Sequence, residues 1–311
     1  MAGMTTPTRD TMTAAPDAHG VRAPGNRLPD ETHIGSVHLD VADVTRSLEY
    51  YRDVLGFRVT KQETSAAGTT ASLAAQDDDT TLIQLHEQRG ANPVPRTGRL
   101  GLYHFAILLP NRAALGRFVV HLAARRVPAG MSDHLVSEAI YLRDPDGLGI
   151  EVYADRPRDS WRWTGGELAM TTEPLDVDDL VAAAGDVPWG GMPAGTTVGH
   201  VHLHVGDLPT AADFYHAALG LDAVVWRYPG ALFLSAGGYH HHLGLNTWAA
   251  GAPAAREGDA RLREWELVLP DADAVDRAVD GLERAGHRVE RSADGTRIAD
   301  PWGTTLRLVT P

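Results

Sequence analysis

Apolar and polar residues alternate with period two in several short segments of the first half of the chain. Such alternation is typical of half-buried strands, and it predicts strands at 34–41, 57–59, 70–74, 80–86, 102–109, 137–142 and 148–153. Apolar residues at helical spacing predict helices at 45–54, ended by Gly56, and at 112–125. The pattern therefore predicts two successive units, each made of a strand, a helix and further strands.

The second half of the chain repeats this arrangement. The corresponding positions, in the first and second halves respectively, are Gly35 and Gly199, His38 and His202, Tyr51 and Tyr215, Pro110 and Pro270, and Asp144 and Asp300. An internal repeat of this kind indicates four βαβββ modules, and a module with so few strands cannot close a core alone. We therefore expect an α+β fold of two domains, each an incomplete β-barrel of two paired modules.

The repeat also predicts the domain boundaries. Modules 1 and 2 would form a first domain at 33–154, and modules 3 and 4 a second domain at 197–311. The segment 155–196 is expected to be a linker with one short helix near 175–184. Residues 1–32, rich in Thr, Ala, Pro, Gly and Asp without periodicity, are expected to be a disordered tail.

The stretch from Ser132 to Glu151 contains the clearest candidate chemistry. It predicts a hairpin around the turn at 144–147, whose second strand has the carboxylate of Glu151 between two apolar residues. A carboxylate in such a strand is either solvated or held inside by a partner, and a metal ion is one such partner. Because the chain has no cysteine, any metal must be bound by nitrogen and oxygen. His38 and His104, on two earlier strands, could supply imidazoles.

The run of His134, Tyr141, Asp144, Gly147 and Glu151 resembles the signature of extradiol ring-cleavage dioxygenases of the vicinal-oxygen-chelate superfamily. Residues 101–110 resemble its two-domain catechol 2,3-dioxygenase branch. This resemblance places His38, His104 and Glu151 at the family's metal-ligand positions. Two histidines and one carboxylate form the facial triad of non-haem iron oxygenases, so Fe²⁺ is the expected cofactor, and Mn²⁺ fits the same ligands.

Ring cleavage also needs groups that move protons. The resemblance places His134 and Tyr141 at the signature's histidine and tyrosine, where an imidazole that titrates near neutral pH and a phenol could act as acid, base or hydrogen-bond donor. His86, at the end of the strand 80–86, lies near the family's other pocket histidine. A solvated histidine at the end of a strand is an equally good interpretation of His86.

The second half departs from the ligand pattern. His202 matches His38, but the positions matching His104 and Glu151 are Glu264 and Arg307, and a permanently charged guanidinium would repel a metal ion. The second half is nevertheless rich in histidine, and residues on one strand face could form a second metal site with Glu264. The histidines concerned are His200, His202, His204, His240, His241 and His242.

Charge and composition limit the partners. Lys+Arg 28 against Asp+Glu 41 gives a net charge of −13, which disfavours nucleic acid and anionic membrane surfaces. The first residues lack the apolar core of a secretory signal, so we expect a cytoplasmic protein. The expected partners are a small aromatic diol and O₂. Partly open barrels also leave strand edges that neighbouring subunits often cover, so we expect a homo-oligomer.

Two other functions remain open at the level of sequence. A divalent-metal lyase or isomerase of the glyoxalase type could use the same scaffold, because a fold does not decide its chemistry. A non-catalytic protein that binds small molecules, as resistance proteins of this fold do, would need no facial triad. The extradiol dioxygenase is favoured because it explains the metal ligands and the pair of His134 and Tyr141 together.

Overall fold

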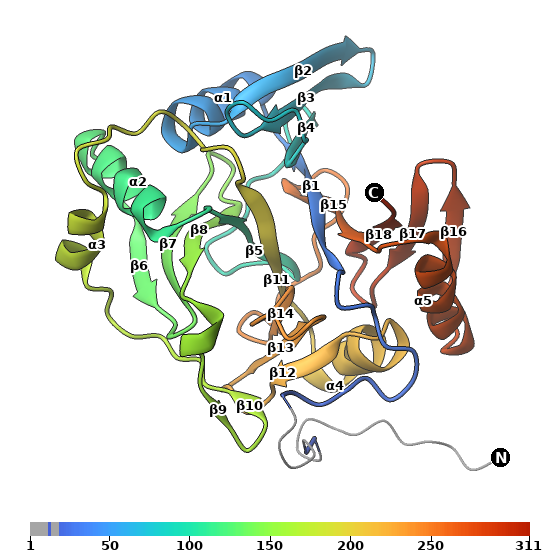
Figure 1. Cartoon of the computed structure of the whole chain (residues 1–311). Coiled ribbons are helices and arrows are strands. Elements are labelled where there is room, and N and C mark those ends of the chain that lie inside the picture. The colour runs from blue at the N-terminus through green and yellow to red at the C-terminus, as the bar shows by residue number, and fades with distance from the viewer. Residues whose placement is uncertain (1–11, 14–18) are drawn as a thin grey trace.

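The computed structural model describes residues 12–13 and 19–311. In this part of the chain most of the strands form two eight-stranded mixed sheets, while the helices lie at the periphery (Figure 1). One continuous core of buried aliphatic and aromatic side chains joins the sheets. The four expected βαβββ modules and the α+β class are confirmed.

The first and fourth modules together form one sheet, in the order β16-β17-β18-β15-β1-β4-β3-β2. The first module comprises β1 (His33–Val41), α1 (Val44–Glu49), the π-helical turn η2 (Tyr50–Leu55), β2 (Arg58–Ser65), β3 (Gly68–Ala74) and β4 (Ile83–Glu87). The fourth comprises β15 (Arg261–Val268), α5 (Ala272–Arg284), β16 (Val289–Ser292), β17 (Gly295–Ala299) and β18 (Thr305–Val309).

The second and third modules form the other sheet, in the order β12-β13-β14-β11-β5-β8-β7-β6. The second module comprises β5 (Gly101–Leu108), α2 (Arg112–Ala124), β6 (Gly130–Asp133), β7 (Ser137–Arg143) and β8 (Gly149–Asp155). The third comprises β11 (Thr197–His204), α4 (Leu208–Ala212), the π-helical turn η4 (Asp213–Ala218), β12 (Asp222–Val225), β13 (Ala231–Ser235) and β14 (Leu243–Asn246).

The predicted pairing of modules was wrong. We expected modules 1 and 2 to share one barrel and modules 3 and 4 the other, but β1 pairs antiparallel with β15 and β11 pairs antiparallel with β5. The opening strand of every module offers an equivalent edge, so the repeat itself does not determine which two strands meet. The loop 88–100 and the segment 156–196 are long enough to carry the chain between the sheets.

A side-chain hydrogen bond connects module 1 with module 2, and an equivalent hydrogen bond connects module 3 with module 4. The Tyr51 hydroxyl, in η2 of module 1, donates to the Asp144 carboxylate in the β7–β8 turn of module 2, at 3.4 Å. The repeat places Tyr215 and Asp300 in the same relation, at 3.0 Å. Each aspartate also accepts two backbone N–H groups of its own turn. These side chains therefore fix the turn and anchor it to the preceding module.

The connection between modules 2 and 3 has more structure than expected. It contains the short turn η3 (Arg158–Ser160), a hairpin of β9 (Trp163–Thr164) and β10 (Glu167–Leu168), and α3 (Val177–Ala183). The predicted short helix is confirmed. Asp176 caps α3, because its carboxylate accepts the backbone N–H of Asp179.

Residues 19–32 are ordered against the third module, which contradicts the prediction of a disordered tail for this part. Val21 forms a β-bridge with Ala223 on the outer strand β12. Asp222 accepts the backbone N–H of Ala23 at 2.9 Å and the Arg27 guanidinium at 2.7 Å. Composition gave no sign of these contacts. The rest of the predicted tail, residues 1–11 and 14–18, lies outside the described residues.

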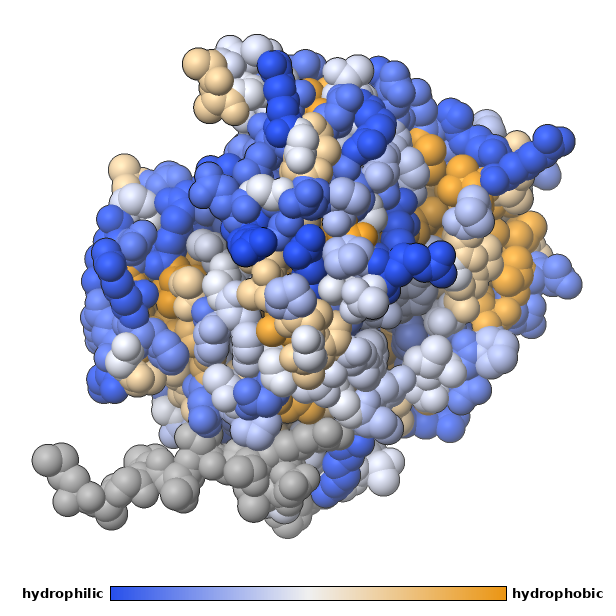
Figure 2. All heavy atoms as spheres, turned by 180° about the vertical axis from the view of Figure 1, so that it is seen from behind, coloured by the Kyte–Doolittle hydropathy of each residue, from blue (hydrophilic) through white to orange (hydrophobic). Residues whose placement is uncertain are grey.

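The surface seen from behind is dominated by hydrophilic residues, and hydrophobic residues form separate patches (Figure 2). In the described part of the chain the exposed large hydrophobic residues are Val120, Leu135, Val181, Val187 and Trp248. No helix in this part is long and apolar enough to cross a membrane. The outer strands β2 and β16 lie at the ends of their sheet, and the expectation of a homo-oligomer stays a prediction.

Leu28→Ala tests whether the segment 19–32 is part of the folded core. Leu28 is 1% exposed, so its truncation should lower the free energy of unfolding by about 2–4 kcal/mol. Urea denaturation measures this value, and Leu135→Ala, at a residue 43% exposed, is the matched control with an expected change of at most about 0.5 kcal/mol. Equal stability of both variants would mean that the segment does not belong to the core.

Candidate metal centre

Three buried side chains converge in the sheet of modules 2 and 3. His104 lies on β5, Glu151 on β8 beside it, and His200 on β11 on the other side of β5. The His104 Nε2 and Glu151 Oε2 atoms are 2.9 Å apart, His200 Nε2 and Glu151 Oε2 are 3.2 Å apart, and the two Nε2 atoms are 3.4 Å apart. All three residues are at most 4% exposed.

The electrostatics of this cluster favour an ionised Glu151 carboxylate beside a neutral His200 imidazole. Burial opposes ionisation of Glu151, but His200 and His104 outweigh it and hold the pKa of the carboxyl well below its usual range. Burial lowers the pKa of His200 to about 4, although Glu151 favours its protonated form. At neutral pH the cluster therefore has two imidazole nitrogens around one anionic oxygen. These are the donor types that a divalent transition metal prefers.

The spacing of the donor atoms also fits a metal ion. Adjacent ligands of an octahedral ion with bonds of roughly 2.1 Å lie about 3 Å apart, and the three separations of 2.9, 3.2 and 3.4 Å are close to this value. These three residues would therefore hold a divalent ion as the facial triad of two histidines and one carboxylate does, which leaves positions for other ligands.

His38, the third predicted ligand, is not in this cluster. It lies on β1 in the other sheet, because module 1 pairs with module 4. There its Nδ1 is 3.3 Å from Glu264, and its Nε2 is 3.0 Å from the Ser36 hydroxyl. His200 takes the place expected for His38. The repeat matches His200 with Ser36 and His202 with His38. The donor therefore lies on β11 of module 3, two residues before the position that corresponds to the predicted ligand.

The suggested second metal site, in which the histidines of the second half would join Glu264, does not form in the described part of the chain. Glu264 lies in the sheet of modules 1 and 4, whereas the histidines lie in the sheet of modules 2 and 3 or in the loop before β14. Of these histidines, His200 belongs to the donor set described above. The run of histidines at 240–242 was the feature of the sequence that indicated metal-binding chemistry in this part of the molecule.

A cavity of about 220 Å³ opens over the three donors. Its lining combines polar groups with aromatic walls, and it includes Tyr103, His134, Tyr141, Met170, His202, Tyr228, Phe233, His241 and Trp248. Met170 comes from the segment between modules 2 and 3, which therefore covers part of the cavity. A small concave space with a few converging polar groups is the usual form of a small-molecule site.

His134 and Tyr141 meet in this cavity, as predicted. The Nδ1 of His134 is 2.6 Å from the carbonyl oxygen of Thr171, which can only accept, so Nδ1 is the protonated nitrogen. The other nitrogen, Nε2, therefore accepts the Tyr141 hydroxyl at 2.6 Å. Burial and the nearby Glu151 raise the pKa of Tyr141 well above its usual range, so the phenol stays protonated.

His86 does not line the cavity. It lies on β4, in the sheet of modules 1 and 4, and its Nε2 is 3.4 Å from His38 Nδ1. The pairing of modules is again the reason, because it places β4 next to β1 instead of the donor set. The predicted catalytic position of His86 was therefore wrong.

Two histidines in the cavity were not predicted as site residues of this donor set. The His241 ring packs against the His200 ring at an interplanar angle of 46°, with centroids 4.1 Å apart. His202 and His104 make an edge-on contact with centroids 4.9 Å apart, and the Nε2 of His202 accepts the Asn246 amide at 2.9 Å. Burial lowers the pKa of both His202 and His241 well below the usual range. Both are therefore neutral and can accept a proton or a hydrogen bond.

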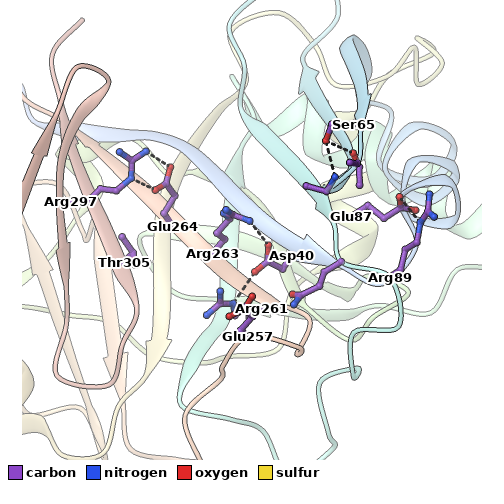
Figure 3. A pocket seen from close by; sticks show the side chains of 14 residues that line it. Asp40, Ser65, Glu87, Arg89, Glu257, Arg261, Arg263, Glu264, Arg297 and Thr305 are labelled. Atoms are coloured by element: carbon purple, nitrogen blue, oxygen red, sulfur yellow. Dashed lines mark hydrogen bonds and ion pairs between the residues drawn. The ribbon is translucent and has the colours of Figure 1, made fainter.

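The corresponding cleft in the sheet of modules 1 and 4 has different chemistry (Figure 3). Arg307 stands where the repeat has Glu151, and its Nε is 3.3 Å from Glu264, while Arg297 binds the same carboxylate at 2.8 Å. Asp40 accepts both Arg261 and Arg263. Guanidinium groups therefore already neutralise the buried carboxylates here. This arrangement is consistent with the expectation that Arg307, at the position corresponding to Glu151, disfavours a metal ion.

Comparison with known proteins agrees with the fold and the repeat. The family model described as the Glyoxalase/Bleomycin resistance protein/Dioxygenase superfamily matches residues 33–152 and 197–308. The chain therefore belongs to this superfamily.

A relative from Bacillus subtilis (strain 168), named catechol-2,3-dioxygenase, is 43% identical over 278 residues, which cover 88% of this chain and 95% of the relative. Among solved structures, a protein of Bacillus subtilis subsp. subtilis str. 168 has a TM-score of 0.63 with 16% identity, and covers 92% of this chain and 86% of its own. Glyoxalase I from Zea mays has a TM-score of 0.55 with 17% identity, and covers 90% and 92% respectively. These structures share the fold.

His200→Ala and His38→Ala form a matched pair that tests the ligand set. His200→Ala removes one of three donors and should lower the divalent metal bound at equilibrium from about one ion per chain to near zero. His38→Ala should keep full binding, because His38 lies in the other sheet. Metal analysis after dialysis, with circular dichroism to confirm folding, gives the result. Loss of metal in His38→Ala alone would place the ion beside Glu264 instead.

The burial of His38 has a consequence for stability at acid pH. Burial lowers the pKa of His38 from 6.5 to about 4, so below about pH 6.5 the unfolded chain binds a proton that the folded chain excludes. The free energy of unfolding should then fall as the pH drops from about 6.5 to about 4, by at most about 1.4 kcal/mol per pH unit for this group. His38→Gln should show a shallower decline in urea denaturation at about pH 7 and about pH 5. An unchanged decline would mean that His38 is not buried in its neutral form.

Proposed function

We propose that this protein is an extradiol dioxygenase that opens a catechol-type ring beside its two hydroxyl groups with O₂. The observation that carries the proposal is the buried donor set of His104, Glu151 and His200 at the base of a small cavity that also contains the pair of His134 and Tyr141. The relative with 43% identity, named catechol-2,3-dioxygenase, supports it. The proposed metal is Fe²⁺, and Mn²⁺ fits the same donors.

His104, Glu151 and His200 would hold this ion. When bound, the ion would act as a Lewis acid toward the two substrate oxygens and would take up O₂. The protein supplies the rest. Because an imidazole must be neutral to bind a metal ion, the donor set would contribute the single negative charge of Glu151. This charge compensates only part of a divalent cation, so the site retains attraction for a catecholate oxygen.

Tyr141 and His134 would move one proton of the substrate. The Tyr141 hydroxyl donates its proton toward His134 Nε2, which leaves the lone pairs of the phenol oxygen free to accept a substrate hydroxyl. The proton of that hydroxyl passes to the Tyr141 oxygen while the phenol proton passes to His134. Thr171 keeps His134 in the required tautomer through its carbonyl oxygen. The reverse transfer can later return the proton for cleavage of the O–O bond.

The cavity favours a small ring. Phe233, Trp248 and Met170 contribute apolar surface against which an aromatic ring can pack. The volume of about 220 Å³ lies below the range of roughly 300–1,000 Å³ that is usual for drug-sized ligands. We therefore infer a single-ring diol as the substrate.

Oxygen consumption tests the proposed function. Protein loaded with Fe²⁺ under anaerobic conditions and then given catechol and air should form a yellow ring-opened product and consume about one O₂ per catechol. Glu151→Gln, which keeps the shape of the side chain but removes its charge, should form none. Metal-dependent isomerisation of a hemithioacetal without oxygen consumption would instead identify a lyase of the glyoxalase type. Tight catechol binding without turnover would identify a binding protein.

His134→Phe tests the acid–base pair. It should bind iron and catechol nearly as the wild type does, but its kcat should fall by about 10²- to 10⁴-fold, because it removes the group that takes the proton from Tyr141. His86→Phe is the matched control, since His86 lies in the other sheet and should leave kcat unchanged. Wild-type turnover in His134→Phe would remove His134 from the mechanism.

A further inference from the structure

Two further clefts adjoin the cavity over the donor set, and Tyr103 lines all three spaces. The first cleft, of about 500 Å³, shares Tyr103, His104 and Tyr141 with the cavity. The second, of about 180 Å³, shares Tyr103 and Trp248 with it. A ring held over the donors therefore has room for a substituent that extends into either cleft.

Arg143 lies where the two clefts meet, because it lines both of them. It is on β7, two residues after Tyr141, and alternate residues of a strand point to the same face. Tyr141 lines the cavity and is half-buried, whereas Arg143 is exposed. The Arg143 side chain therefore lies one step farther out on the same face, at the mouth of the site.

No carboxylate of the described residues pairs with Arg143. Its Nη1 donates to the Gly147 carbonyl oxygen at 2.9 Å, which holds the side chain in place. The two nearest acidic residues along the chain are already occupied, because Asp144 accepts the N–H groups of its own turn and Asp146 pairs with Arg46. A guanidinium group has five N–H donors, so most of those of Arg143 are available to a ligand.

The charge of the two clefts differs from that of the whole protein. Among the described residues, no aspartate or glutamate lines either cleft, and Arg96 adds a second guanidinium group to the smaller one. The cavity itself contributes Glu151, whose charge the proposed divalent ion would offset. The chain as a whole has a net charge of −13. A cleft lined by one sign of charge concentrates ions of the opposite sign, so this mouth favours an anion.

The aromatic wall of the cavity also continues to the mouth. Trp248 is 50% exposed and lines both the cavity and the smaller cleft. Its ring meets the Tyr103 ring edge-on, with centroids 5.5 Å apart. An aromatic surface beside two guanidinium groups suits an aromatic compound with an anionic end better than an inorganic anion.

We propose that Arg143 is a specificity-determining residue that binds a carboxylate group on the substrate, so that the preferred substrate is a catechol with a short carboxylate side chain. This inference rests on the proposed function and names its substrate class more closely. The planar fork of a guanidinium group matches a carboxylate through two parallel N–H···O hydrogen bonds. The diol end would lie over the donor set, and the side chain would extend past Tyr103 to Arg143.

Anaerobic titration calorimetry with the Fe²⁺-loaded protein tests this preference without turnover. The probes are 3,4-dihydroxyphenylacetate, which has a carboxylate, 4-methylcatechol, which is neutral, and dopamine, which is cationic. The carboxylate probe should bind with a Kd about tenfold lower than that of 4-methylcatechol, and dopamine should bind most weakly. Equal Kd values for the carboxylate and the neutral probe would overturn the inference, and so would no binding of either.

Arg143→Gln and Arg143→Glu test whether the preference depends on this residue. Arg143→Gln should bring the Kd values of the carboxylate and neutral probes within about twofold of each other, and Arg143→Glu should reverse the order in favour of dopamine. Arg288→Gln is the matched control, because the Arg288 side chain is 88% exposed in module 4 and should not affect the preference. Circular dichroism confirms folding. A carboxylate preference that persists in Arg143→Glu would overturn the inference.

Turnover distinguishes the failure of this inference from the failure of the proposed function. The ratio of kcat/KM for 3,4-dihydroxyphenylacetate to that for 4-methylcatechol should be about ten in the wild type and about one in Arg143→Gln. Ring cleavage of both compounds with equal kcat/KM would overturn the inference and leave the proposed function intact. Tighter binding of the carboxylate probe without ring cleavage would overturn the proposed function and retain Arg143 as the residue that binds the anion.

Discussion

The antiparallel pairing of β11 with β5 is the constraint on which the site depends. It aligns His202 with His104 and His200 with Ala106, while the parallel strand β8 aligns Glu151 with Ala106 on the other side of β5. The register therefore brings one donor from each strand to one point. A shift of one residue would turn the histidines of β11 to the opposite face of the sheet. The buried carboxylate would then lose a partner and become costly.

The two sheets show how one repeated architecture supports different chemistry. In one sheet the equivalent positions hold His200, His104 and Glu151, and in the other they hold Ser36, Glu264 and Arg307. The first set offers two imidazole rings and one carboxylate, which suits a cation. The second contains its own cation, so its carboxylate is already neutralised. A few side chains on equivalent strands therefore decide which of the two clefts can bind a metal.

Local patterns made much of this structure predictable. The repeat gave four modules, the turn at Asp144 gave the hairpin, and the isolated carboxylate of Glu151 together with His134 and Tyr141 pointed to the cavity. These features depend on residues close in sequence. The pairing of modules depends on contacts between distant and nearly equivalent strands, which no local pattern encodes. His38 and His86 were misplaced for this reason.

Anomalous X-ray scattering at the iron edge, from crystals loaded with Fe²⁺ without oxygen, tests most directly whether modules 2 and 3 jointly build the metal centre. The account predicts one strong peak at about 2.0–2.3 Å from His104 Nε2, His200 Nε2 and a Glu151 oxygen. It also predicts no peak beside Glu264 and Arg307 in the other sheet. A peak beside His38 and Glu264, or none near Glu151, would contradict it.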